Sequence, residues 1–207
     1  MPLVAVLDYG IGNLHSAQKA LERAGADARL TADHGLIREA SGVVLPGVGA
    51  FGRCMEELER AELDELAIEC AGSGRPFLGV CIGMQMLYEG SEESPDVPGL
   101  GVLPGIVRRL PEGVKHPQMQ WNVVIRRGQS GLLDGLPDPV WTYFVHSFAA
   151  DSPHHAVAVC DYGGPVVAAV ERDALWATQF HPEKSGSTGL AILANFVRAA
   201  AGQAEAA

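Results

Sequence analysis

A cysteine and a histidine, one hundred positions apart, have the residue types of a nucleophile and its base. Cys81 lies in Gly79-Val80-Cys81-Ile82-Gly83, a G-x-C-x-G pattern, and His181-Pro182-Glu183 follows later in the chain. A thiolate attacks electrophilic carbonyls, a histidine takes and returns protons, and a nearby carboxylate orients the imidazole ring. These residues predict nucleophilic catalysis by Cys81, His181 and Glu183. The alternative is a buried structural cysteine and an unrelated surface histidine.

The segments on either side of Cys81 would present its side chain at a sharp turn. Residues 76–80 form an apolar run that predicts a strand, and residues 84–88 predict a helix that follows it directly. The pattern is the cysteine counterpart of the G-x-S-x-G nucleophile elbow, and small glycines allow the tight geometry. The N-terminus of the following helix favours a thiolate over a thiol.

A glycine-rich loop follows another predicted strand. After the apolar residues 43–45 the chain reads Pro46-Gly47-Val48-Gly49-Ala50-Phe51-Gly52. An ordinary turn between a strand and a helix needs one glycine rather than three. In a parallel sheet this loop and the cysteine turn would meet at the carboxyl edge of the strands. We therefore expect an N–H group near Gly49 to form an oxyanion hole together with the N–H of Ile82.

The order of apolar segments predicts the fold that positions these groups. Runs at 3–7, 43–45 and 76–80 predict buried strands, and 13–24 and 51–71 predict helices. This alternation predicts an α/β fold with a mostly parallel central sheet flanked by helices. Short runs at 105–110, 123–126, 141–148, 157–159, 166–170 and 174–180 predict additional antiparallel strands, before a helix at 188–200. We expect one domain over residues 1–207, with residues 201–207 frayed.

Composition excludes several classes of function. The net charge of −10 argues against a nucleic-acid partner, because such binding needs a basic surface. No stretch resembles a membrane span or a signal peptide, so we expect a cytoplasmic protein without a membrane partner. The cysteines are scattered without a C-x-x-C pair, so neither a metal site nor a disulfide framework is indicated. Cys54 and Cys70 read as small core residues.

Three weaker signals leave alternatives open. Residues 8–13 suggest a dinucleotide-binding loop of the G-x-G-x-x-G type, but His15 stands where that motif has its third glycine. A tight turn or a partner-facing loop is therefore favoured. His146 is a second candidate base, although its apolar strand favours a structural or pocket-wall histidine. Trp121 and Trp141 read as packing or interface residues rather than as platforms for stacking bases.

Together these motifs resemble the class I, triad-type glutamine amidotransferases. Residues 79–85 match the nucleophile motif of that family, and residues 8–13, 143–147 and 181–185 also fit. Met84 and the Pro46-Gly47-Val48-Gly49 loop are similar to one branch, the glutaminase subunits of imidazole glycerol phosphate synthase. The match runs from residue 4 to about 198. Gln118 and Gln120 depart from it, because the family commonly has histidine and glycine there.

The resemblance implies a flavodoxin-like fold and hydrolysis of L-glutamine to glutamate and ammonia, without a metal or cofactor. It implies a heterodimer in which ammonia passes to a (β/α)8-barrel cyclase subunit of histidine biosynthesis. The catalytic residues would be Cys81, His181 and Glu183. The residues implied around glutamine are Gly47, Gln85, Glu93, His146, Ser147 and Phe148. Those implied at the partner interface are Asn13, Trp121 and Lys184, of which Lys184 would relay the partner's state.

Two other functions are compatible with parts of this pattern. One is a glutaminase that serves another synthase, such as one for anthranilate or pyridoxal phosphate, against which Met84 and Val48 count. The other is a docking module on the same fold without catalysis. The intact Cys81, His181 and Glu183 argue against that second alternative.

Overall fold

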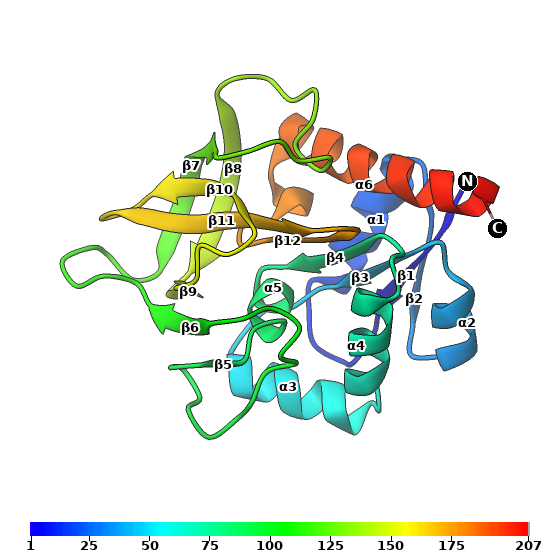
Figure 1. Ribbon diagram of the computed structural model, residues 1–207, viewed down its shortest axis with the longest axis horizontal. Coiled ribbons are helices and arrows are strands. Elements are labelled where there is room, and N and C mark those ends of the chain that lie inside the picture. Colours follow the sequence, from blue (N-terminus) through cyan, green and yellow to red (C-terminus); the bar gives the residue numbers. More distant parts are fainter. Residues whose placement is uncertain (207) are drawn as a thin grey trace.

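The computed structural model describes residues 1–206, and the side chains of residues 1–203. Its main feature is a nine-stranded mixed sheet in the order β2-β1-β3-β4-β12-β11-β10-β7-β8 (Figure 1). The predicted α/β fold, with a parallel half and additional antiparallel strands, is confirmed. A smaller sheet, β5-β6-β9, lies beside the antiparallel half.

The parallel half of the sheet is built from short apolar strands. They are β1 (Leu3–Leu7), β2 (Asp27–Thr31), β3 (Gly42–Leu45), β4 (Phe77–Val80) and β12 (Leu175–Thr178). All residues of β3, β4 and β12 are buried. Helices cover both faces of this half, so strands with apolar side chains in both directions are stable there.

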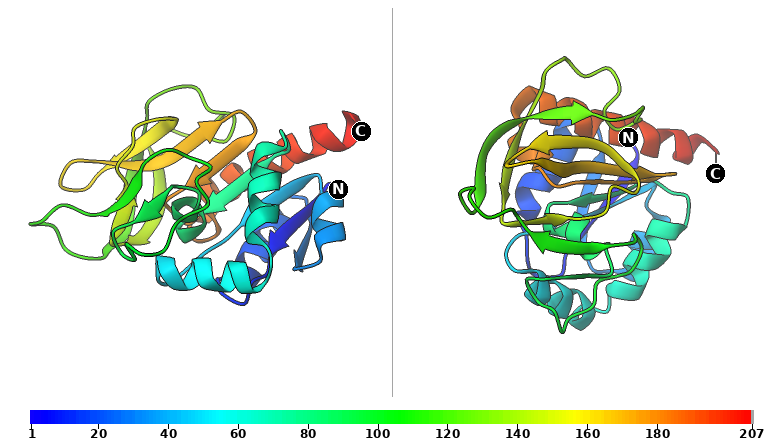
Figure 2. Two further views of the ribbon diagram at one scale, coloured as in Figure 1. Left: turned by 60° about the horizontal axis from the view of Figure 1, so that its bottom comes forward. Right: turned by 60° about the vertical axis from the view of Figure 1, so that its left-hand side comes forward.

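The helices lie in two layers (Figures 1 and 2). One layer contains α1 (Leu14–Arg23) and α6 (Gly186–Ala206). The other contains α3 (Phe51–Arg60), α4 (Asp64–Gly72) and α5 (Ile82–Met86). The short α2 (His34–Glu39) connects β2 to β3, near the outer edge of the sheet.

The second half of the chain adds the antiparallel strands, which extend away from the helices (Figure 2). In the main sheet these are β7 (Gln118–Arg126), β8 (Val140–His146), β10 (Ala156–Asp161) and β11 (Pro165–Arg172). The small sheet consists of β5 (Gly90–Ser91), β6 (Ile106–Arg109) and β9 (Phe148–Ala150). A short 3₁₀ helix, η1 (Pro182–Lys184), connects β12 to α6.

The prediction of one helix over residues 51–71 is wrong, because the chain turns between α3 and α4. Glu62 has a φ of 57°, and the N–H groups of Leu63 and Glu62 donate to the carbonyls of Leu58 and Glu59. This is the Schellman arrangement that ends a helix, with glutamate at the left-handed position that glycine usually occupies. A glycine would have signalled the end of the helix in the sequence.

Other boundaries also differ from the prediction. No element was predicted at β2 and α2, and β7 begins five residues before the predicted residue 123. The predicted strand 141–148 is divided between β8 and β9, and the predicted strand 174–180 ends at Thr178. Residues 201–206 continue α6 rather than fraying, consistent with the high helix propensity of their alanines. Residue 207 lies outside the described residues.

The strand order brings three loops together at one edge of the sheet. β3, β4 and β12 are parallel neighbours, so the segments that follow Leu45, Val80 and Thr178 meet at their carboxyl ends. The approach is close: a Cβ on Gly83 would lie 1.9 Å from the carbonyl oxygen of Leu45. Only glycine fits at that position, so this edge fixes the loop that carries Cys81.

Candidate active site

Cys81 occupies a strained turn between β4 and α5. Its φ of 55° and ψ of −109° lie outside the regions that L-residues usually adopt, and its N–H donates to the carbonyl of Thr178 at 2.8 Å. A non-glycine residue in this conformation costs about 1–3 kcal/mol, which the surrounding structure must offset. The turn has the predicted elbow geometry and places the cysteine at the N-terminus of α5.

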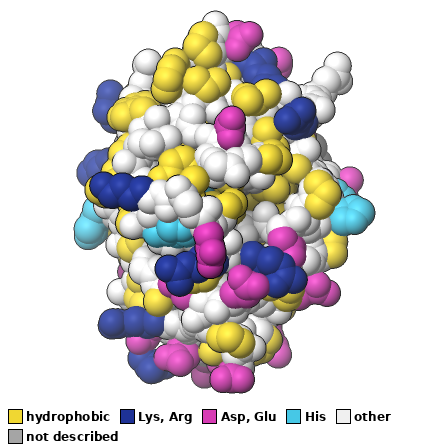
Figure 3. Space-filling view, turned by 90° about the vertical axis from the view of Figure 1, so that its left-hand side faces the viewer, with side chains coloured by type: hydrophobic (Ala, Val, Ile, Leu, Met, Phe, Trp, Pro, Cys, Tyr) yellow, Lys and Arg dark blue, Asp and Glu magenta, His cyan; other side chains and the backbone are white. Residues whose placement is uncertain are grey.

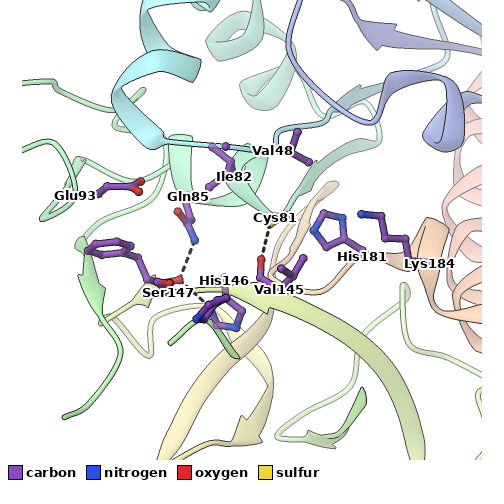
Figure 4. Close-up of a pocket in the computed structure, with 13 residues that line it drawn as sticks. Val48, Cys81, Ile82, Gln85, Glu93, Val145, His146, Ser147, His181 and Lys184 are labelled. Atoms are coloured by element: carbon purple, nitrogen blue, oxygen red, sulfur yellow. Dashed lines mark hydrogen bonds between the residues drawn. The ribbon is translucent and has the colours of Figure 1, made fainter. Parts of the chain in front are cut away.

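His181 and Glu183 are brought together directly after β12. The Nδ1 atom of His181 lies 2.8 Å from Oε1 of Glu183, and both side chains are almost completely buried. A carboxylate oxygen can only accept a hydrogen bond, so Nδ1 of His181 is the donor. In the neutral ring the proton is therefore on Nδ1 and the lone pair is on Nε2. Within the described residues Nε2 has no hydrogen-bond partner, and the ring lies next to Cys81 (Figure 4). The free Nε2 lone pair is therefore available as the base.

The surroundings of His181 favour its charged form. Burial by itself lowers the pKa, but the adjacent Cys81 and the hydrogen-bonded carboxylate of Glu183 outweigh it and raise the pKa of His181 from 6.5 to about 9. A ring that accepts the proton of the thiol therefore remains stable as an imidazolium between two negative groups. This is the electrostatic requirement for a thiolate nucleophile.

A cavity of about 320 Å³ opens in front of Cys81 (Figure 4). The predicted site residues that line it are Gly49, Cys81, Ile82, Gln85, Glu93, His146, Ser147, Phe148, His181 and Lys184. Val48, Pro117 and Val145 complete the wall. Of the remaining predicted residues, Glu183 lies behind His181. Gly47, Asn13 and Trp121 are not part of the lining.

Gly47 has a packing position beneath this cavity. A Cβ at residue 47 would lie 2.7 Å from the backbone nitrogen of Gly83 and 2.8 Å from Cβ of Ile82. The glycine therefore allows the loop after β3 to contact the turn that carries Cys81. Gly47 therefore packs against the turn that carries the predicted oxyanion donor Ile82, and its contact with a substrate stays a prediction.

The loop at residues 46–49 is held by buried donors behind it. The hydroxyl of Tyr9 donates to the carbonyl of Pro46 at 2.6 Å, and the thiol of Cys54 donates to the carbonyl of Val48 at 3.4 Å. The C=O and N–H of a trans peptide point in opposite directions, so the N–H of Gly49 faces away from Cys54. Among the described hydrogen bonds none uses the N–H of Val48 or Gly49. These donors remain available for an oxyanion.

Both buried donors remain protonated near neutral pH. Burial, together with the neighbouring Cys54, raises the pKa of Tyr9 far above its usual range. Burial likewise raises the pKa of Cys54 to about 11. The predicted core position of Cys54 is confirmed, and its thiol also contacts the loop beside the cavity.

His146 lies in the wall of the cavity rather than in the position of a second base. Its Nδ1–H donates to the carbonyl of Phe148 at 2.8 Å, and burial lowers the pKa of His146 to about 4. The ring is therefore neutral near pH 7, with its Nε2 lone pair buried. This agrees with the pocket-wall alternative for His146.

Sequence reasoning missed Gln179, which contacts the nucleophile. Its side chain is completely buried, and its Nε2 lies 3.8 Å from Sγ of Cys81. The only signal was its position, two residues before His181 in the chain. The sequence pattern does not reveal the contact, because it depends on the pairing of β12 with β4.

A hydrophobic strip lies on the antiparallel end of the molecule. Met119, Trp121 and Ile125 alternate along β7, and Trp141 pairs with the same face from β8; each is between 45% and 60% exposed. Hydrophobic side chains are visible across the upper half of this end in Figure 3. Large exposed hydrophobic residues of this kind mark interaction surfaces. We call these four residues the β7–β8 strip.

Asn13, a predicted interface residue, directly precedes α1 and makes no side-chain capping hydrogen bond. Its amide therefore does not serve to start the helix. No helix of the described residues is both long enough and apolar enough to cross a membrane.

Comparisons with known proteins agree with this geometry. The family model "Glutamine amidotransferase class-I" matches residues 5–200. The chain is 48% identical over 202 residues to the imidazole glycerol phosphate synthase subunit HisH of Deinococcus radiodurans, covering 95% of this chain and 94% of that relative. It is also 48% identical over 196 residues to the HisH subunit of Methanothermobacter thermautotrophicus, covering 94% and 98% of the two chains.

Solved structures show the same fold at lower identity. A structure described as a glutamine amidotransferase superimposes with a TM-score of 0.75 at 19% identity, covering 96% of this chain and 98% of the other. A chain of the PurLQS structure from Thermotoga maritima gives a TM-score of 0.75 at 17% identity, covering 95% and 98%. At these identities the likeness concerns the fold alone.

Proposed function

The chain belongs to the family of class-I glutamine amidotransferases, and on that premise we propose that it is the glutaminase subunit of an imidazole glycerol phosphate synthase. It hydrolyses L-glutamine to glutamate and ammonia, and ammonia passes to a cyclase subunit in histidine biosynthesis. The observation that carries this proposal is the strained Cys81 next to a His181 whose Nδ1–H is held by Glu183. The names of the 48%-identical relatives specify the synthase.

In the first half-reaction the Cys81 thiolate attacks the carboxamide carbon of glutamine. The S–C bond forms, and negative charge develops on the amide oxygen, which the N–H groups near Gly49 and the N–H of Ile82 stabilise. As N1 of α5, Ile82 has no N–H partner within the helix. His181 then protonates the departing nitrogen, the C–N bond breaks, and ammonia leaves a glutamyl thioester on Cys81.

In the second half-reaction water replaces the sulfur. The neutral His181 takes a proton from water through Nε2, and the hydroxide attacks the thioester carbon. The C–S bond breaks, the new carboxyl group releases its proton to solvent as glutamate leaves, and the thiolate and the imidazolium are restored. Throughout, Glu183 accepts from Nδ1–H, which keeps the lone pair of His181 on Nε2 and stabilises its charge.

Acceptor groups in the cavity fit the α-ammonium group of glutamine. Oε1 of Gln85 is buried without a partner among the described residues, and Gln85 lines the cavity. The Glu93 carboxylate lies in the same wall, where its Oε2 accepts from the N–H of Phe51 at 2.8 Å. We assign the α-ammonium to these two side chains, and the α-carboxylate to backbone N–H groups of residues 146–148.

The partner binds, in this proposal, over Asn13, Lys184 and the β7–β8 strip. Trp121 is half exposed and forms an edge-to-face pair with Tyr143, whose ring centroid lies 6.2 Å away. Aromatic anchors of this kind dominate binding energies at interfaces. Lys184 borders the cavity one residue after Glu183, so a contact there would reach the catalytic residues. We place the complex in the cytoplasm, where free glutamine is available.

The test is glutaminase turnover with and without the cognate cyclase subunit and its nucleotide ligand. We expect ammonia release to increase at least tenfold when both are added. Cys81→Ala should abolish it, whereas Cys70→Ala, which alters a buried cysteine on α4, should retain it. Stimulation instead by an anthranilate or pyridoxal phosphate synthase partner would assign the chain to another branch. A wild-type complex without glutaminase activity would support the docking-module alternative.

A further inference from the structure

The amide of Gln179 faces the catalytic sulfur because of strand register. The last pair of the parallel β12 and β4 strands is Thr178 with Val80, so the next residues, Gln179 and Cys81, lie opposite each other. The N–H of Cys81 donates to the carbonyl of Thr178, and the N–H of Gln179 donates to Ala168 on β11. The backbone on both sides of this contact is therefore fixed by the sheet.

The hydrogen bonds of Gln85 determine which end of the Gln179 amide faces the sulfur. Nε2 of Gln85 donates to the carbonyl of Phe148 at 2.9 Å and to Oε1 of Gln179 at 3.0 Å. An amide nitrogen cannot accept, so the oxygen of Gln179 must be the atom that faces Gln85. Its Nε2 is then the atom 3.8 Å from Sγ of Cys81.

We propose that Gln179 is a further catalytic residue, whose amide N–H donates to Sγ of Cys81 and stabilises the thiolate that attacks the substrate. The proposal rests on the glutaminase function above and adds to it a donor beyond His181. A hydrogen bond to a sulfur anion is stronger than one to a neutral thiol, and burial strengthens it further. The contact therefore favours the reactive form over the resting one.

The same chain of amides connects the nucleophile to the substrate cavity. Gln85 lies one turn of α5 after Cys81, and its N–H donates to the carbonyl of Cys81 at 3.2 Å. Gln85 and Phe148 both line the cavity, whereas Gln179 is completely buried and is not part of the lining. The wall that would hold glutamine thus also holds the Gln179 amide in the orientation that donates to sulfur.

The test measures the reactivity of Cys81 without any turnover. The rate of Cys81 alkylation by iodoacetamide is followed against pH by peptide mass spectrometry in wild type, Gln179→Met and Gln179→Glu. Methionine has a similar length without a donor, and glutamate places negative charge beside the sulfur. We expect the midpoint of the pH profile to rise by about one pH unit in Gln179→Met, and further in Gln179→Glu.

The other charged and titratable groups around the sulfur remain in these variants. They are His181, Glu183 and Lys184 after β12, His146 on β8, Glu93 after β5, and Cys54 on α3, with Tyr9 behind the loop.

The chain also offers a matched control. Gln118 is an equally buried glutamine whose Nε2 lies 3.7 Å from Sγ of Cys160, another buried cysteine. Gln118→Met removes the same type of contact at a sulfur outside the cavity.

An unchanged Cys81 midpoint in Gln179→Met would overturn the proposal, as would an equal rise in Gln118→Met. If Gln179→Met does not fold, as judged by circular dichroism, the isosteric Gln179→Glu decides the question by itself. The two proposals fail separately. A wild-type complex that releases no ammonia from glutamine refutes the glutaminase function. An active wild type with unshifted profiles in the Gln179 variants refutes only the role of Gln179.

Discussion

Replacing Glu183 by glutamine tests how the triad sets the charge on His181. The carboxylate and the ring lie 2.8 Å apart, and both side chains are at most 4% exposed, so water screens the interaction little. The rise in the pKa of His181 from 6.5 to about 9 corresponds to about 3 kcal/mol of preference for the imidazolium. Cys81 and Glu183 both contribute to it, against burial.

Glu183→Gln removes one of these two negative groups. We expect the pKa of His181 to fall by at least one pH unit, because the neutral amide no longer stabilises the imidazolium. The amide nitrogen can also donate to Nδ1, which moves the ring proton to Nε2 and removes the base. In Ser-His-Asp triads the equivalent loss slows turnover about ten-thousandfold. We expect glutamine turnover here to slow by roughly a hundredfold to ten-thousandfold.

The raised pKa of His181 also makes the free energy of unfolding depend on pH. The folded-state pKa of His181 lies above the unfolded value, so its stabilising contribution is fully present below pH 6.5 and is lost as the pH rises through about 9. Glu183→Gln should lower the free energy of unfolding at pH 6, and that loss should diminish towards pH 9. The two proteins therefore converge at high pH.

The assay combines the glutaminase turnover rate of the complex with a titration of the His181 ring protons by NMR and with urea unfolding at several pH values. Glu171→Gln is the control, since Glu171 is a half-buried carboxylate on β11, outside the cavity. A Glu183→Gln protein whose turnover stays within threefold of wild type, or whose His181 titration is unshifted, would refute the reasoning.

Three further substitutions test the loop, the turn and the partner surface. Tyr9→Phe removes the donor to Pro46 and should destabilise the fold by about 1–3 kcal/mol and slow turnover about tenfold. The control Tyr88→Phe removes a buried hydroxyl that has no partner among the described residues, and it should change neither quantity. If the two variants have equal effects on urea unfolding and turnover, the loop has no special role. Gly47→Ala places a Cβ 2.7 Å from the backbone of the Cys81 turn and should lower the free energy of unfolding by about 1–3 kcal/mol. An unchanged urea midpoint would contradict the close packing of this loop against the turn. Trp121→Ala should raise the Kd for the cyclase at least tenfold in calorimetry without loss of stability. The similarly exposed Ile68→Ala on α4 should not raise it, and an unchanged Kd for Trp121→Ala would place the interface elsewhere.

The parallel half of the fold was predictable because its signals are local. Leu3–Leu7 and Phe77–Val80 are continuous apolar runs, and burial on both faces requires that composition. β2 was missed since Asp27–Thr31 lies at the edge of the sheet and alternates polar and apolar residues over only five positions. The end of α3 was missed because glutamate, rather than glycine, adopts the left-handed position at residue 62.

The site shows the same division between local and long-range information. Cys81, His181 and Glu183 were predictable because their motifs are contiguous and their residue types specify the chemistry. The contacts of Gln179 with Cys81, and of Tyr9 with Pro46, depend on strand order and on side chains far apart in the sequence. A single sequence does not reveal such contacts, because no local pattern distinguishes these residues from ordinary core positions.

The most direct test of the central claim is covalent trapping of the nucleophile. The complex with the cyclase subunit is incubated with 6-diazo-5-oxo-L-norleucine, a glutamine analogue with an electrophilic carbon, and its tryptic peptides are examined by mass spectrometry. We predict one adduct per chain, on Cys81, and protection of Cys81 by excess L-glutamine. A complex left unlabelled, or labelled instead on Cys54, Cys70 or Cys160, would contradict the assignment of Cys81 as the residue that attacks glutamine.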